Sequence, residues 1–300
     1  MANPNTPPLV DVDLVSQLLA DQFPHWAHLP LLPLGAAGTD NAIFRLGHDL
    51  VVRLPKVDWA VGQAEKEHLW LPKLAPLLPL QVPTPLALGE PGCGYPWRWA
   101  VCRWVPGEVA IPANISDVGA TAQALAEFVR GLQRIDIDGG PRAGRQNHYR
   151  GLPLAALDGR VRGALGELGN RVDVHAATRV WELALAAPVW SGEPVWLHGD
   201  LHAHNLLAIG GRITAVIDFG LLAVGDPATD LMVAWKMFDA KGRDVFRAAV
   251  KADDTAWARA RGWALYSAII ALPFYWDTNP DFVADSLRTF TEVLADEPAR

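Results

Sequence analysis

The stretch that decides the fold spans residues 196–220 and reads WLHGDLHAHNLLAIGGRITAVIDFG. The glycine pair at 210–211 separates two apolar runs, a pattern that predicts a β-hairpin with a two-residue turn. In that register Asn205 lies opposite Val216. Asp218 then becomes a diagonal neighbour of Asn205 at the open end of the ladder, roughly 7–8 Å away. The hairpin is therefore expected to bring an amide oxygen and a carboxylate together.

Two hard oxygen ligands at the end of one hairpin indicate a cation site. Mg²⁺ prefers carboxylate and phosphate oxygens and keeps several of its waters, so Asn205 and Asp218 are the candidate metal ligands. Asp200 lies five residues before Asn205, on the loop that enters the hairpin. From there its carboxylate can face the metal without ligating it, as a catalytic base would.

Taken together, these features resemble the catalytic segment of protein-kinase-like phosphotransferases. The closer resemblance is to the aminoglycoside phosphotransferase and choline kinase-like family. Its His-Gly-Asp-x-x-x-x-Asn motif is matched by residues 198–205, and its Ile-Asp-Phe/Trp-Gly motif by residues 217–220. A third motif, Gly-Asp-Pro-x-x-Asp-Leu, is matched by residues 225–231. Three motifs in the family's order make the resemblance specific, and it extends across nearly the whole chain.

The resemblance implies a role for each motif residue. Asp200 would orient an acceptor hydroxyl or take its proton, and His198 would brace the catalytic loop. Asn205 and Asp218 would hold Mg²⁺ against the nucleotide phosphates, and Asp230 would help to fix the loop from the next helix. These roles agree with phosphoryl transfer, which depends mainly on positioning and electrostatics.

The cation expected to contact the nucleotide phosphates is unusual in this chain. The family generally carries lysine at the strand position of Arg53, with a helix glutamate, here Glu67, bracing it. Arginine keeps the charge but has a different bulk and geometry. Lys56 is an alternative cation, although strand alternation places it on the opposite face from Arg53. Arg53 and Glu67 could also be ordinary solvated charges.

Two further segments of the implied nucleotide site match the family less closely. Gly38 and Thr39 belong to a Gly/Ala-rich turn, which could cover the phosphates or simply connect two strands. Arg103, Trp104 and Val105 resemble the hinge between the lobes, where backbone groups would meet the purine edge.

Elsewhere the chain divides by composition. Residues 1–105 hold more than half of the 24 prolines and short strand-like runs. Strands are predicted at 42–46, 49–54 and 97–105, and a helix at 61–78 that Pro72 should kink or restart. After Pro106 and Gly107 the sequence is mostly helical. The predicted helices are 117–135, with Ser116 as the N-cap, and 153–168, 174–187, 227–239, 243–252, 254–271 and 281–295.

The expected fold is therefore α+β, a protein-kinase-like fold with two lobes. Residues 1–105 would form a small β-rich nucleotide-binding lobe, and residues 106–300 a larger helical lobe for catalysis and substrate binding. At the start of that lobe's third motif, Asp226 before Pro227 is also a typical helix N-cap with proline at the first helical position.

The overall composition excludes several classes of protein. Of 300 residues, 50% are hydrophobic and 20% are charged, as in an ordinary globular protein. The net charge of −7 argues against nucleic acid or an anionic membrane as a partner. Two cysteines and the absence of a recognisable signal peptide or spanning segment indicate a reduced, cytoplasmic protein.

The resulting hypothesis is an enzyme that transfers the γ-phosphoryl group of ATP or GTP to a hydroxyl of a small molecule, using Mg²⁺. Aminoglycosides, macrolides, amino alcohols, sugars and homoserine-like metabolites all stay open as acceptors, and the resemblance favours a role in antibiotic resistance. Acidic residues such as Asp253 and Asp277 could line a pocket for a cationic acceptor, or could be solvated helix ends.

Two other classes of function stay open. A pseudokinase-like module that binds nucleotide without turnover is supported only by Arg53. A metal-dependent hydrolase is suggested by the cluster of His198, Asp200, His202 and His204. That alternative needs further His or Asp ligands, because catalytic metal centres use three or more protein ligands. His202 and His204 otherwise fit loop or packing residues.

Overall fold

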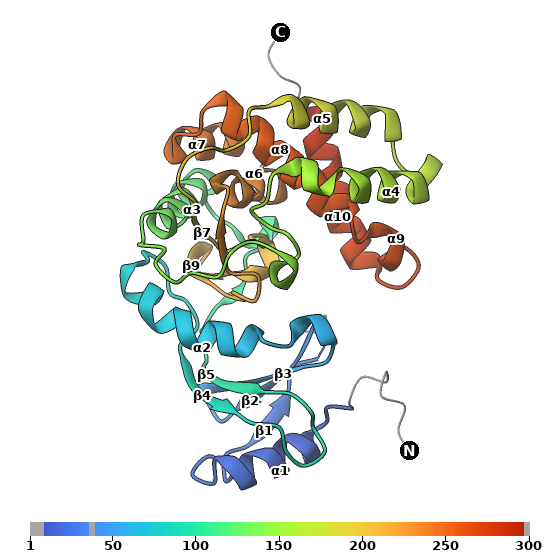
Figure 1. The fold of residues 1–300 in the computed structure, drawn as a ribbon. Coiled ribbons are helices and arrows are strands. Elements are labelled where there is room, and N and C mark those ends of the chain that lie inside the picture. Colours follow the sequence, from blue (N-terminus) through green and yellow to red (C-terminus); the bar gives the residue numbers. More distant parts are fainter. Residues whose placement is uncertain (1–8, 36–39, 297–300) are drawn as a thin grey trace. The chain divides into compact units, whose positions relative to one another are not determined.

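The computed structural model describes residues 9–35 and 40–296. The chain forms two compact units, shown as ribbons in Figure 1. The first unit comprises Met1–Pro106 with Val216–Gly220, and the second comprises Gly107–Ala215 with Leu221–Arg300. Within the described residues, no helix is both long and apolar enough to cross a membrane.

Within its described residues, the first unit contains a five-stranded antiparallel sheet with the order β1-β2-β3-β5-β4. The strands are β1 Leu31–Pro33, β2 Asn41–Leu46, β3 Leu50–Pro55, β4 Pro85–Gly89 and β5 Trp99–Arg103. Helices α1 Val12–Gln22 and α2 Gln63–Leu74 cover opposite faces of this sheet (Figure 1).

Alternation along β3 decides what each face of the sheet carries. Val52 and Leu54 are fully buried and pack with α1 residues such as Leu18 in the larger apolar cluster. Val51 faces the other way, into the cluster under α2 that includes Ala64. Arg53 alternates with Val52 and Leu54, so it also lies on the α2 face.

The predicted elements of this unit are present with shifted ends. Strands β2 and β3 lie within one residue of the expected ranges, and Gly47 between them has φ +58°. The expected helix 61–78 is α2, which ends at Leu74 and continues as the 3₁₀ turn η2 Ala75–Leu77. Pro72 does not break α2, because it falls in the last turn, where few hydrogen bonds remain to lose. Strand β5 is shorter than the expected 97–105, and no helix was predicted at α1.

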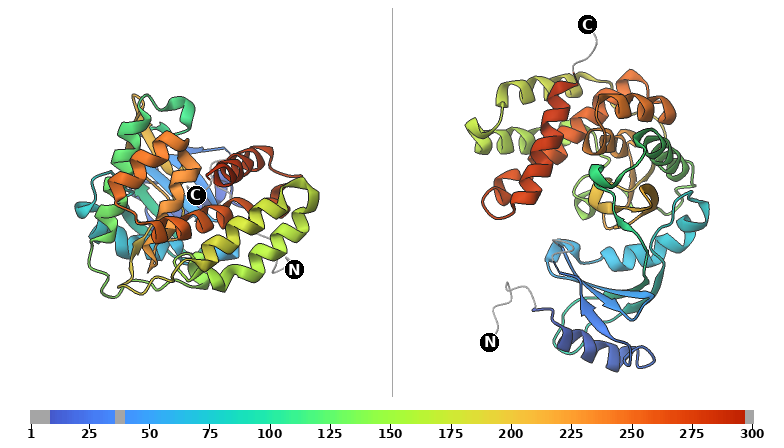
Figure 2. Two further views of the ribbon diagram at one scale, coloured as in Figure 1. Left: turned by 90° about the horizontal axis from the view of Figure 1, so that it is seen from above. Right: turned by 180° about the vertical axis from the view of Figure 1, so that it is seen from behind.

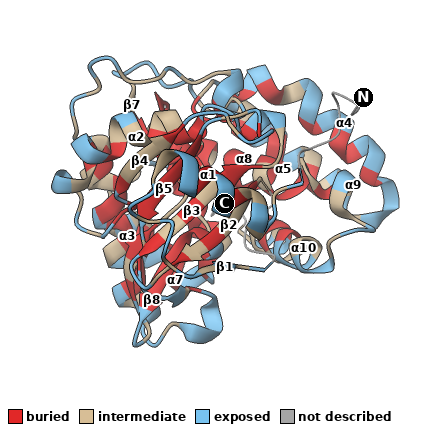
Figure 3. Ribbon diagram, turned by 90° about the horizontal axis from the view of Figure 1, so that it is seen from below, coloured by how far each residue is buried: buried red, intermediate tan, exposed pale blue. Residues whose placement is uncertain are grey.

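Helices make up most of the second unit (Figure 2). Its α-helices are α3 Val118–Gln133, α4 Asp158–Leu168, α5 Val174–Ala186, α6 Val233–Met237, α7 Ala240–Val250, α8 Asp254–Ile269, α9 Leu272–Tyr275 and α10 Pro280–Ala295. Helix α8 is central, since it packs against α5 and α10. Buried residues run along α8 and along β3 and β5 of the first unit (Figure 3).

Two small sheets lie among these helices. Strands β7 Val195–Leu197 and β10 Ala223–Gly225 form one, and the other has the order β6-β8-β9. Its strands are β6 Glu108–Val109, β8 Leu206–Ile209 and β9 Arg212–Val216. The predicted hairpin is confirmed, because Gly210 and Gly211 join β8 to β9 with φ +57° and +76°. Left-handed conformation at both turn residues is what a type I′ turn requires.

The N-cap expected at Ser116 is wrong. Helix α3 begins one residue later, and Asp117 caps it by accepting a hydrogen bond from the Ala120 N–H at 2.9 Å. The Ser116 hydroxyl instead donates to the Gly211 carbonyl at 3.2 Å, which ties the hairpin turn to the start of α3. Asp226 does cap the next segment, with Ala228 as donor. That segment is a 3₁₀ helix, η8 Pro227–Met232, before α6 begins.

Candidate functional site

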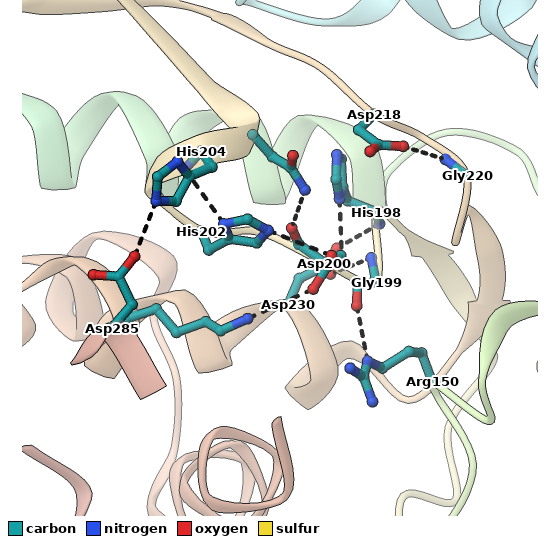
Figure 4. Close-up of polar contacts among 12 residues, drawn as sticks. Arg150, His198, Gly199, Asp200, His202, His204, Asp218, Gly220, Asp230 and Asp285 are labelled. Carbon is teal, nitrogen blue, oxygen red and sulfur yellow. Dashed lines mark hydrogen bonds and ion pairs between the residues drawn. The ribbon is translucent and has the colours of Figure 1, made fainter. Parts of the chain in front are cut away.

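The loop that follows β7 is held by one buried carboxylate. Asp230 accepts two backbone hydrogen bonds, from the His198 N–H at 2.7 Å and the Gly199 N–H at 2.8 Å (Figure 4). Burial raises the pKa of the Asp230 carboxyl, while His198 and the two N–H donors oppose this rise. Gly199 has φ +85°, and a Cβ there would lie 2.8 Å from the Leu221 carbonyl oxygen. The tight loop therefore requires glycine at this position.

The same loop is closed by two side chains that the motif predicted. His198 is fully buried, and its Nδ1 accepts a hydrogen bond from the Asp200 N–H at 3.2 Å. Asn205 ends the 3₁₀ turn η7 Ala203–Asn205, and its Nδ2 donates to the backbone carbonyl of Asp200 at 2.9 Å. Because both contacts fix the backbone of Asp200, its carboxylate has a defined direction, with 31% of the side chain exposed.

Cationic groups surround the Asp200 carboxylate. Lys236 Nζ lies 3.5 Å from Oδ1. His202 Nε2 lies 3.4 Å from Oδ2, and Figure 4 shows this imidazole beside Asp200. Burial alone would raise the pKa of Asp200. The charge of Lys236, with His202 and Arg150, outweighs burial and holds the pKa well below its ordinary range. Asp200 is therefore ionised at neutral pH and can accept a hydrogen bond from a hydroxyl.

Asp200 lies on the wall of a cavity of about 230 Å³ within the second unit. Its lining comes from the loop 200–204 and from α6, α8 and α10, and includes Arg150, Lys236 and Arg288. None of these three residues is predicted from the sequence. Lys236 did leave a signal, because it is the one charged residue in the apolar run 231–238.

A second cluster of charged groups lies in the first unit. Arg53 on β3 bridges two carboxylates, with Nη1 2.7 Å from Glu67 Oε2 and Nη2 3.3 Å from Asp218 Oδ1. Only 14% of the Arg53 side chain and 3% of the Glu67 side chain are exposed, so neither is a solvated charge. Burial would lower the pKa of Arg53, but Glu67 and Asp218 together raise it above its ordinary value.

Asp218 has a strained backbone. Its φ is +63°, in the left-handed region that non-glycine residues rarely adopt. Its Oδ1 accepts hydrogen bonds from Arg53 and, at 3.4 Å, from the Gly220 N–H. Strain of this kind gathers at functional sites, where the surroundings hold it in place.

The second cation near this cluster is Lys66, which the sequence analysis did not identify. Burial lowers the pKa of Lys66 to about 8, and the charges of Glu67 and Asp218 limit that shift. Lys56, the alternative considered from the sequence, follows the end of β3, and its backbone N–H donates to the Asp40 carbonyl. Lys66 could be found from its place beside Glu67 on α2.

The expected hinge residues lie at the end of β5 and just beyond it. The backbone N–H groups of Arg103 and Trp104 donate to the carbonyls of Thr84 and Asp49, at 2.8 and 2.7 Å. Val105 is buried. Gly38 and Thr39 of the expected phosphate loop lie outside the described residues.

The donor set of the expected metal site fits Mg²⁺. Because Asn205 Nδ2 donates to the Asp200 carbonyl, the amide oxygen is the atom directed to other partners, and Asp218 supplies a carboxylate. Both atoms are hard oxygen ligands. Asn205 belongs to the second unit and Asp218 to the first, so their convergence stays a prediction.

The histidine cluster has a different role from the one that a hydrolase requires. His202 caps η7 by accepting a hydrogen bond from the His204 N–H, and His204 pairs with Asp285 at 2.9 Å. Across the described part of the chain, no group of three His, Cys, Asp or Glu side chains could hold a metal ion. The structure thus gives the hydrolase alternative no support.

Solved structures of phosphotransferases share this fold. The GDP complex of an aminoglycoside 2'-phosphotransferase is 21% identical with a TM-score of 0.72, and the match covers 94% of this chain and 97% of that one. A macrolide 2'-phosphotransferase from Brachybacterium faecium is 23% identical with a TM-score of 0.61, over 97% of this chain and 99% of the other. These neighbours confirm the kinase-like α+β fold expected from the sequence.

Sequence comparison points to the same group. An aminoglycoside 3'-phosphotransferase from Escherichia coli is 28% identical over 145 residues, which are 47% of this chain and 53% of the relative. The match therefore spans only about half the length of that relative. A model of the phosphotransferase enzyme family matches residues 32–263, more than three quarters of the chain. The resemblance seen in the three motifs is thus confirmed, and the chain belongs to the phosphotransferase enzyme family.

Proposed function

We propose that this protein transfers the γ-phosphoryl group of ATP or GTP to a hydroxyl group of a small molecule. The observation that carries the proposal is the ionised Asp200, fixed by His198 and Asn205 on the wall of a cavity in a member of the phosphotransferase family. An acceptor hydroxyl in this cavity would donate a hydrogen bond to Asp200, which orients it for attack and takes its proton.

The cluster in the first unit would bind the nucleotide phosphates. Arg53 presents a guanidinium that pairs well with phosphate oxygens, and Glu67 holds it in position. Asn205 and Asp218 would hold Mg²⁺, which when bound neutralises charge on the phosphates. Because Arg103 and Trp104 already use their N–H groups, the N–H of Val105 is the proposed donor to the purine edge.

Nucleotide-bound neighbours support a nucleotide co-substrate. One neighbouring structure is a GDP complex and another is described as ADP-bound. The pseudokinase-like alternative is not favoured, because Arg53 keeps the buried pairing with Glu67 that a phosphate-binding cation needs. The neighbours act on aminoglycosides and macrolides by name, which supports antibiotic resistance as a candidate role.

The test is a nucleotide-consumption screen with Mg-ATP and Mg-GTP, run separately against hydroxylated small molecules. Asp200→Asn should lower kcat about 10²- to 10⁴-fold, the usual contribution of general acid–base catalysis, with nucleotide affinity unchanged. Asp281→Asn is the control, since Asp281 is an exposed carboxylate on α10 outside the cavity. Turnover by Asp200→Asn at the rate of the control would refute the proposed role of Asp200.

A further inference from the structure

The basic side chains that line the cavity beside Asp200 outnumber its carboxylates. Among the described residues that line it, the acidic ones are Asp200 and Asp285, and the basic ones are Arg150, Lys236 and Arg288. Both carboxylates already have partners, because Asp200 pairs with Lys236 and Asp285 pairs with His204. Three basic side chains therefore face two carboxylates, so the lining keeps an excess of positive charge, and arginine does not lose its charge in proteins.

Arg150 is a buried cation whose guanidinium is held in place at the cavity wall. The residue is only 7% exposed, and its Nε donates to the Gly199 carbonyl at 3.1 Å (Figure 4). The guanidinium lies over the Tyr266 ring, 5.0 Å from the centroid, which fixes its plane. Its Nη1 is buried and has no hydrogen-bond partner among the described residues. A buried donor without an acceptor is costly, so an acceptor oxygen brought to this guanidinium would be favoured.

Arg288 adds to the same positive field from α10. One of its nitrogens donates to the backbone carbonyl of Lys236, which holds the guanidinium at the cavity wall. In addition to burial, the positive charges of Arg150 and Arg288 each contribute to lowering the pKa of Lys236. The three cations therefore act on one small volume.

We propose that the acceptor carries an anionic group, a carboxylate or a phosphate, which binds Arg150 and is attracted by Arg288 while its hydroxyl meets Asp200. This inference rests on the proposed function and narrows its substrate class. A cavity of about 230 Å³ suits a small metabolite. A polycationic acceptor would have to place its amines against two guanidinium groups, and such like-charge contacts select against a ligand.

The acidic residues that suggested a cationic acceptor lie elsewhere. Neither Asp253 nor Asp277 lines the cavity. Asp253 caps α8 by accepting a hydrogen bond from the Ala256 N–H at 2.7 Å. This residue is therefore a helix-end charge, and a cationic acceptor becomes an outcome that the experiment must exclude.

The first experiment measures anion binding to the cavity in the absence of turnover. Inorganic phosphate is titrated calorimetrically into the protein saturated with Mg²⁺ and a non-hydrolysable nucleotide, so that the nucleotide-phosphate site is filled. Arg150→Gln and Arg288→Gln should each weaken phosphate binding about tenfold or more, as expected for loss of a charged hydrogen bond. Arg130→Gln is the control, because Arg130 donates to the Ala249 carbonyl outside the cavity. Phosphate binding that is absent, or equal in all variants, overturns the inference.

The second experiment uses the acceptor found in the nucleotide-consumption screen. The inference expects an anionic acceptor whose KM rises about 10- to 100-fold in Arg150→Gln, with a smaller change in kcat and partial rescue by Arg150→Lys. A preferred acceptor that is polycationic, such as kanamycin, overturns the inference and leaves the proposed function standing. Absence of acceptor-dependent nucleotide consumption across the whole screen has the opposite consequence, because it removes the proposed function while the phosphate titration still reports on the cavity.

Discussion

The pairing of Arg53 with Glu67 predicts a large and specific loss of stability when the arginine is removed. In Arg53→Met, the Glu67 carboxylate stays buried without its partner, and its Oε1 already has no hydrogen-bond partner among the described residues. Breaking a buried ion pair from one side costs about 3–5 kcal/mol. The contact with Asp218 adds little, because 47% of the Asp218 side chain is exposed and exposed pairs contribute at most about 1 kcal/mol.

A second substitution separates loss of the pair from loss of packing. Arg53→Met combined with Glu67→Leu removes both charges, and apolar replacement of a whole buried pair is often neutral. The double variant should therefore recover about 2–4 kcal/mol relative to the single one. Arg98→Met is the matched control in the same unit. Its pair with Glu90 is exposed on both sides, so its loss should cost less than about 1 kcal/mol.

The pH dependence gives an independent check on the same carboxylate. Burial raises the pKa of Glu67, and Arg53 opposes that rise, so removing Arg53 raises the pKa further. Between the pKa of Glu67 in the unfolded chain and its higher pKa in the folded variant, the folded variant binds a proton that the unfolded chain has released. Its stability therefore falls as pH rises through this range. The deficit of Arg53→Met should be larger at pH 8 than at pH 5.

Urea unfolding at both pH values measures these differences, with hydrogen exchange of β3 and α2 peptides to locate them in the first unit. A cost below about 1 kcal/mol for Arg53→Met at pH 8, as for an exposed pair, would refute a buried pair between Arg53 and Glu67. So would a double variant that is as unstable as the single one.

Two further predictions follow from the loop and from α2. Asp230→Asn leaves one acceptor oxygen for the two backbone N–H donors of His198 and Gly199. It should therefore destabilise the fold by about 2–3 kcal/mol in urea unfolding and lower kcat. An unchanged urea midpoint would contradict this role of Asp230. The pKa of Lys66 is lowered to about 8 from 10.5, so its charged form is disfavoured in the folded chain. Lys66→Met should therefore stabilise the protein most below pH 8, with the gain lost as pH rises through 10.5; an equal gain at pH 7 and pH 11 would argue against it.

The features that could be predicted from the sequence are those determined by neighbouring residues, such as turns and helix caps. The glycine pair at 210–211 specifies its hairpin because both positions need positive φ. Asp226 before Pro227 specifies a cap for the same kind of reason. The cap of α3 was misplaced by one residue because Ser116 and Asp117 both have capping side chains, and Asp117 is the one that takes the Ala120 N–H. Ser116 is engaged by the hairpin turn, which is distant in sequence.

Residues placed by tertiary structure could not be found in this way. Arg150 lies in an irregular segment with no motif, yet its side chain supports the Gly199 carbonyl, 49 positions away. Helix α1 does carry local signals, because Asp11 caps it and Val15, Leu18 and Leu19 follow helical spacing, but its packing against strand residues such as Phe44 is a tertiary feature. No local signal in either segment reports its partner. The motif residues could be grouped from the sequence because the resemblance to the family implied which of them act together.

The acceptor problem shows why whole-chain charge is a poor guide to a site. A net charge of −7 suggests affinity for cations, but charges separated by more than about 8–10 Å are screened at physiological salt. A ligand inside the cavity therefore responds to the groups that line it, and three basic side chains there outnumber the two carboxylates among the described residues. The three sequence motifs follow the family's pattern, whereas Arg150, Lys236 and Arg288, which contribute to the cavity's charge, lie outside them. In this fold, a few side chains that line the cavity can thus change the charge of the preferred acceptor while the three motifs stay the same.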